Sequence, residues 1–148
     1  MSDDDVSTAF AVLNEIGIIA QLGRATFEAR LPPGVILPQW SVLNHLVRVG
    51  DGRTPLDMAR AFQVPKTTMS HTVAALERRG WVEFRPNPDD GRSKRVWLTA
   101  AGRAFRDDGI ASVAPDLARI LGDLPSGTME ALLPHLRHLR ETMDAARD

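Results

Sequence analysis

The chain has 148 residues, a length typical of one compact domain. Hydrophobic residues make up 43% and charged residues 25%, a globular balance that argues against long disorder and collagen-like repeats. The absence of cysteine excludes disulfides, thiolate metal sites, a cysteine nucleophile and sensing by a thiol. No uninterrupted apolar run approaches the roughly 20 residues that cross a bilayer, and the acidic start is unlike a signal peptide. We therefore expect a cytoplasmic protein with no membrane partner.

The net charge of −1 hides an uneven distribution of charge. Residues 54–103 carry 9 Lys/Arg against 5 Asp/Glu, whereas residues 1–30 carry 2 against 5 and residues 104–148 carry 5 against 8. The middle of the chain is therefore at +4 between two ends at −3. This pattern predicts a basic binding surface on an acidic scaffold.

Apolar residues at helical spacing predict a long first helix over residues 5–30, which the sequence Leu-Pro-Pro-Gly at 31–34 ends. A second helix is expected from Pro38, a favourable first helical residue, to the turn at 50–52. The apolar side chains of these helices are Val6, Phe10, Leu13, Ile18, Leu22, Trp40, Leu43, Leu46 and Val47.

A pair of short helices follows. Thr54, Pro55 and Asp57 are typical of a helix start and predict a third helix over residues 55–62. Only a few residues separate it from a fourth helix over residues 65–79, which Gly80 ends. Two helices joined by so tight a turn are a candidate helix-turn-helix.

The next segments predict a β-hairpin and two further helices. Residues 81–85 and 94–98 alternate in polarity around a polar tip, with Val82, Phe84, Val96 and Leu98 facing inward. We expect Trp81 and Trp97 to pack against the first or the fifth helix. That fifth helix is capped by Thr99 and bent or broken near Pro115, and a last helix spans residues 126–146 with Pro134 inside it.

The fourth helix has a buried stripe of Met69, Val73 and Leu76 and an opposite face that is polar and not acidic. That face could enter the major groove of DNA, which is about 12 Å wide, and Arg78 at its far end suits a phosphate contact or the helix dipole. The helical pattern alone fits an ordinary globular helix equally well. The candidate DNA-binding residues of this helix are Lys66, Thr67, Thr68, Ser70, His71 and Arg78.

The hairpin tip gathers the cations Arg92, Lys94 and Arg95. A charged tip can serve solubility alone, but an arginine on a projecting tip also suits the negative potential of a narrow minor groove. Asp90, two residues before Arg92, is placed to brace the tip.

The segment GWVEFRPNPDDGRSKRVWLTAAG at residues 80–102, with the helix before it, resembles the wing and recognition helix of the MarR family of bacterial regulators. The resemblance implies a mainly α fold with a small β-hairpin wing, and a homodimer on pseudo-palindromic double-stranded DNA. It places Arg92 in the minor groove and Asp90 as the wing-bracing acid. Within one MarR-like domain over 1–148, residues 35–103 would form the winged helix-turn-helix, and residues 1–34 and 104–148 the dimerisation helices.

The family commonly senses a small aromatic or anionic effector, for which Trp40 and His45 are the candidate contacts, although either could simply be a core residue. His135 and His138 lie three residues apart on the last helix, but no third ligand accompanies them, so we expect no metal site and no cofactor. Phosphate-loop, HExxH and GxSxG motifs are absent from the sequence, which argues against an enzyme.

These observations predict a DNA-binding transcriptional regulator, with repression released by an effector. The alternative is a winged-helix module that binds proteins without a specific operator. The cations at Lys66, Arg92, Lys94 and Arg95 favour DNA, because a protein-interaction module has no need for them.

Overall fold

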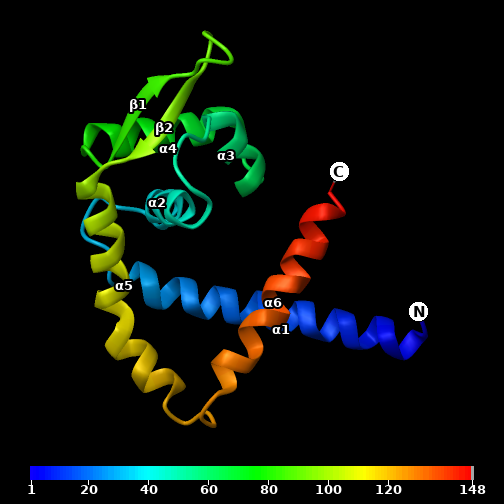
Figure 1. The fold of residues 1–148 in the computed structure, drawn as a ribbon. Coiled ribbons are helices and arrows are strands. Elements are labelled where there is room, and N and C mark those ends of the chain that lie inside the picture. Colours follow the sequence, from blue (N-terminus) through cyan, green and yellow to red (C-terminus); the bar gives the residue numbers. More distant parts are fainter. Residues whose placement is uncertain (148) are drawn as a thin grey trace. The chain divides into compact units, whose positions relative to one another are not determined.

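The computed structural model describes residues 1–147, which form six helices and one two-stranded sheet (Figure 1). The chain divides into two compact units, Met1–Ala114 and Pro115–Asp148. The elements are α1 (Asp3–Glu28), α2 (Leu37–Val49), α3 (Pro55–Phe62), α4 (Lys66–Arg78), β1 (Val82–Pro86), β2 (Lys94–Leu98), α5 (Ala100–Leu121) and α6 (Thr128–Ala145).

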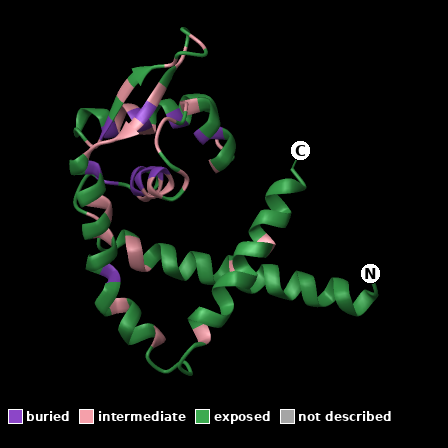
Figure 2. Cartoon of the chain, viewed as in Figure 1, coloured by how far each residue is buried: buried purple, intermediate pink, exposed green. Residues whose placement is uncertain are grey.

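The main core of the first unit lies among α2, α3, α4 and the hairpin. Figure 2 shows buried residues gathered on these elements. Met69, Val73 and Leu76 are 3%, 0% and 0% exposed, which confirms the buried stripe predicted for the fourth helix. The buried cluster consists of Val42, Leu43, Leu46, Met58, Ala59, Met69, Val73, Leu76, Val82 and Val96.

The start of α3 has the predicted caps. The Thr54 hydroxyl accepts a hydrogen bond from the Asp57 amide at 3.1 Å, and the Asp57 carboxylate accepts one from the Thr54 amide at 3.2 Å. The helix ends at Gln63, whose φ of 53° is left-handed, so the chain turns sharply before α4 begins at Lys66. The predicted helix-turn-helix is confirmed as two short helices that pack on each other.

Several helix boundaries differ from the prediction by one or two residues. The first helix ends at Glu28 and not at Arg30. The second begins at Leu37, not Pro38, because the Gln39 side chain accepts a hydrogen bond from the Ile36 amide at 3.4 Å and supplies the cap. The fourth begins after Pro65, whose ψ of 145° is extended.

The hairpin has the predicted antiparallel register, with Val82 opposite Leu98 and Phe84 opposite Val96. The outer edge of β2 has a further partner that the sequence pattern did not indicate. Val96 exchanges backbone hydrogen bonds with Gly52 and Arg53, at 2.9 and 2.8 Å. The hairpin is therefore fixed to the turn that follows α2.

The two tryptophans that flank the hairpin have different partners. Trp81 stacks on Phe105 of α5 with ring centroids 3.8 Å apart, as predicted. The prediction is wrong for Trp97, which lies against Gly52 and beneath the guanidinium of Arg85, 4.2 Å from its ring centroid. The physical reason is the pairing of β2 with residues 52–53, which brings that turn, and not a helix, to Trp97.

The helix α5 starts as predicted, since the Thr99 hydroxyl accepts a hydrogen bond from the Gly102 amide at 3.0 Å. A side chain at Gly102 would meet the Trp81 carbonyl oxygen at 2.0 Å, so this close helix–hairpin contact requires glycine. A bend or a break was predicted near Pro115; the helix is not broken there and continues to Leu121, and the second compact unit begins at that proline. The last helix is also continuous through Pro134.

The first helix exposes most of its surface. None of its residues is buried, and Phe10, Ile19 and Leu22 are 72%, 60% and 66% exposed. By length and composition alone, α1 is long and apolar enough to cross a membrane. Polar residues such as Asn14 interrupt the apolar run, but its 18-residue window contains no more than two charged residues. The core helix of a soluble protein and a signal sequence pass the same test, so one such helix is weak evidence for a membrane.

Candidate nucleic-acid interface

The N-terminal half of α4 presents a polar face without acidic residues. Met69 and Val73 hold the helix on the core. Pro65, at the N-cap, makes no side-chain hydrogen bond to the first turn among the described residues. The first backbone N–H groups of α4 therefore carry the partial positive charge of a helix start, which favours an anion such as phosphate. The predicted contact residues that are exposed on this helix are Lys66, Thr67, Thr68, Ser70, His71 and Arg78.

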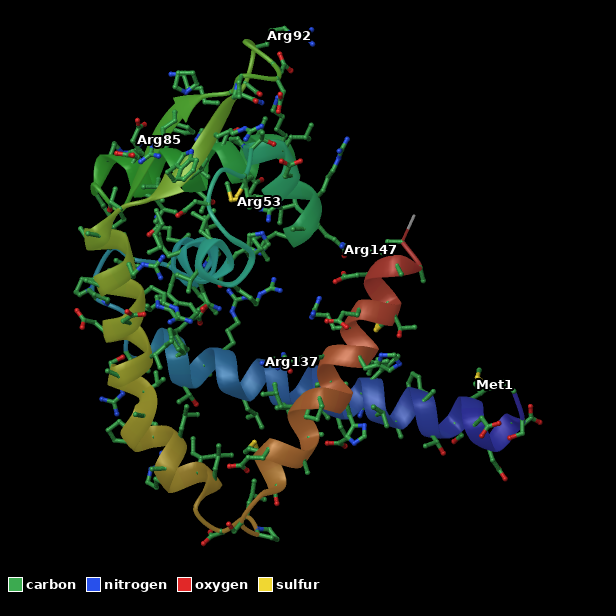
Figure 3. All side chains as sticks on the ribbon, in the orientation of Figure 1. Met1, Arg53, Arg85, Arg92, Arg137 and Arg147 are labelled. Carbon is green, nitrogen blue, oxygen red and sulfur yellow. The ribbon has the colours of Figure 1, made fainter. Side chains whose placement is uncertain are left out.

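Arg92 is almost fully exposed on the hairpin tip, with 94% of its side chain accessible. One oxygen of Asp90 accepts hydrogen bonds from the Arg92 amide at 2.9 Å and from its Nε at 3.3 Å. The two remaining guanidinium nitrogens point outward, and Figure 3 shows Arg92 at the outer end of the hairpin. The bracing contact predicted for Asp90 is thus present.

Arg95 differs from Arg92, because its guanidinium is engaged within the tip. Only 32% of its side chain is exposed. Its Nε donates to the Asn87 side-chain oxygen at 3.2 Å and its Nη2 to an Asp89 oxygen at 2.5 Å. Arg85, which lies opposite Arg95 on β1, is likewise engaged with Glu83 and Trp97. Lys94 is exposed, with its ammonium 5.9 Å from the Phe84 ring.

The two arginines at the end of α4 also differ. Arg78 is exposed in the last turn. Arg79 donates to the Gly34 carbonyl at 2.9 Å and lies 5.0 Å above the Trp81 ring. Arg79 therefore holds the chain before α2 against the hairpin, while Arg78 faces solvent.

Asn87 was not among the predicted site residues. Its side-chain oxygen accepts from the Asp89 amide at 3.0 Å as well as from Arg95, and its nitrogen donates to the Ser93 hydroxyl at 2.8 Å. An asparagine that bonds the amide two residues later is typical of a tight turn. The sequence Asn-Pro-Asp-Asp-Gly carried this signal, although it did not reveal the contact with Arg95.

The two residues predicted for an effector contact different parts of the first unit. Trp40, 9% exposed, packs on Phe27 with centroids 4.3 Å apart and donates to the Arg106 carbonyl at 3.3 Å. His45 meets the edge of Phe62, 5.1 Å between centroids. Burial, and then the charges of Arg48 and Arg53, lower the pKa of His45. The structure does not bring Trp40 and His45 together, and their role in effector binding stays a prediction.

These features define a winged helix-turn-helix protein, in which a polar helix and a basic hairpin are mounted on one core. Residues 34–93 match the sequence model of the MarR family. A probable transcriptional regulator from Pseudomonas aeruginosa has a similar structure, with 29% identity, a TM-score of 0.63 and coverage of 84% of this chain and 96% of that one. Residues 34–93 of the chain are therefore similar to the MarR family.

Two further relatives bear on DNA and transcription. The transcriptional activatory protein BadR of Rhodopseudomonas palustris is 35% identical over 72 residues, which are 47% of this chain and 41% of BadR. A variant of MarR from E. coli, solved in complex with operator DNA, shares the fold at 23% identity and a TM-score of 0.67, over 89% of this chain and 95% of that one.

Proposed function

We propose that this protein is a homodimeric, sequence-specific DNA-binding transcriptional regulator. The observation that carries the proposal is a pair of exposed features on one core, the polar N-terminal half of α4 and the basic side chain of Arg92 on the hairpin tip. A helix of this kind fits the major groove, about 12 Å wide. A guanidinium on a projecting tip suits a narrow minor groove.

The proposed contacts divide by chemistry. Lys66, Ser70 and His71 have the donors and acceptors for base edges, whereas threonine hydroxyls at positions 67 and 68 serve either a base or a phosphate. Arg78 and Lys94 are proposed to contact phosphates, and Arg92 to enter the minor groove. The proposal assigns no catalytic residue and no cofactor.

The test of this function is selection of bound sequences from a random pool of DNA duplexes. A two-fold symmetric site is expected, with half-sites about one helical turn, roughly 34 Å, apart. Such a spacing follows from a dimer that presents two copies of α4. Enrichment of no sequence would contradict the proposal and favour a winged-helix module that binds another protein.

We also propose that Arg92→Ala weakens binding to the enriched duplex by about 1–3 kcal/mol. The substitution removes an outward-facing guanidinium whose one contact among residues 1–147 is with Asp90, so the fold and the oligomeric state should be unchanged. Titration at moderate salt measures the affinity, and sedimentation of the variant is the control. Unchanged affinity would contradict insertion of the tip into the minor groove.

Within this proposal the protein is a cytoplasmic repressor that a small aromatic or anionic effector releases from DNA. The support is likeness to the family, with Trp40 and His45 as the candidate contacts. BadR is named as an activator, so the direction of regulation needs its own test. Expression from a promoter that carries the enriched site should rise when the regulator is deleted. A fall in expression would assign activation instead.

A further inference from the structure

A continuous set of hydrogen bonds leads from strand β2 to the tip. Arg95 donates to the Asn87 oxygen at 3.2 Å, and the Asn87 nitrogen donates to the Ser93 hydroxyl at 2.8 Å. The Ser93 amide and hydroxyl both donate to the Asp90 carbonyl, at 3.2 and 3.5 Å. Asp90 in turn accepts from the amide and Nε of Arg92. Each bond of this set joins residues of the hairpin itself.

We infer that Asn87 and Arg95 are positioning residues for Arg92, which they reach through Ser93 and Asp90. This inference rests on the proposed function, because Arg92 is the group proposed to enter the minor groove. It assigns to Arg95 a role inside the tip, in place of the direct DNA contact expected from its charge.

The charges of the hairpin favour this role for Arg95. Arg85 and Arg95 stand directly opposite each other in the strand register, and like charges in that arrangement destabilise a sheet. Each has its own carboxylate, Glu83 for Arg85 and Asp89 for Arg95. A phosphate contact by Arg95 would compete with Asp89 and release the Asn87 side chain.

Positioning matters here because the tip is long and Arg92 is almost fully exposed. Fixing a flexible side chain on binding costs about 0.5–1.5 kcal/mol, which corresponds to a loss of about 2- to 12-fold in affinity. Bonds that hold the tip before DNA arrives reduce this cost. The uncharged side chain of Asn87 makes three hydrogen bonds within the tip, so its removal tests the ordering of the tip without changing the charge.

The experiment is a double-mutant cycle on the full chain, with the duplex enriched from the random pool as the probe. Asn87→Ala should weaken binding about 2- to 12-fold in the wild-type background. In the Arg92→Ala background the same substitution should change the affinity less than about 2-fold, because the Arg92 side chain that Asn87 positions is absent. Equal effects of Asn87→Ala in the two backgrounds would overturn the inference.

A matched control is Asn44→Ala. Asn44 also accepts hydrogen bonds from an arginine, Arg106, at 3.0 and 2.9 Å, but it joins α2 to α5. Its effect should be the same in both backgrounds, even if it lowers the melting temperature. Coupling of Asn44 to Arg92 as strong as that of Asn87 would mean that the coupling reports general stability, and would overturn the inference.

Hydrogen exchange of the free protein provides a readout that needs no DNA. The amides of Arg92 and Ser93 donate to Asp90, and Asn87→Ala should accelerate the exchange of both. Unchanged exchange would overturn the inference whatever the DNA result. Failure of the proposed function is distinguishable, because it appears as unchanged affinity of Arg92→Ala or as no enriched duplex at all.

Discussion

Affinity for the enriched duplex should fall by about two orders of magnitude when monovalent salt rises from about 50 to about 200 mM. Each chain presents two exposed cations that the proposal places against phosphates, Arg78 and Lys94, and a dimer presents four. A protein that neutralises four phosphates has a slope of log affinity against log salt of about −3.6, because each contact contributes about 0.9.

The predicted slope depends on which cations contact phosphates, so variants can test it residue by residue. Lys94→Gln removes two contacts from a dimer and should reduce the slope by about 1.8. Arg137→Gln, an exposed arginine of α6, is the matched control and should leave the slope unchanged. A flat salt titration of the wild type would contradict DNA binding through these cations and favour a protein partner.

Local sequence signals predicted the elements that carry the interface. The caps Thr54 and Asp57 lie three residues apart, so a short motif contains all the partners of that helix start. The alternation of the two strands likewise defined which side of the hairpin faces the core. Such features depend on neighbours in the chain, which a sequence displays directly.

Long-range contacts set the features that the sequence did not predict. Counting charges treats all arginines alike, but Arg79 is held by the Gly34 carbonyl, 45 residues earlier, and Arg85 by Trp97. The bridge between Arg53 and Val96 spans a similar distance and determines where Trp97 lies. Neither periodicity nor composition indicates these partners, so the basic surface is smaller than the count of cations implied.

The second large effect concerns α1. Deleting residues 1–22 should give a monomer whose affinity for the full two-fold site is about 10²- to 10⁴-fold lower, because two linked half-sites gain avidity that one cannot. The deletion removes apolar residues that the described chain leaves exposed, among them Phe10 and Leu22. Apolar patches of this kind mark an interface. Residues from Gly23 onward are kept because Phe27 packs on Trp40.

Sedimentation measures the oligomeric state, and titration on duplexes with whole and half sites measures the affinity. Phe10→Asp combined with Leu22→Asp in the full chain is the second variant, since it keeps the length of α1 and the Phe27 contact while opposing burial of the apolar face. It should also be monomeric and bind a half-site as the wild type does. A wild-type monomer, or a truncated monomer with full affinity, would contradict the dimer. Flotation of a monomeric wild type with lipid vesicles would assign this face to a membrane, the alternative that the hydropathy of α1 raises.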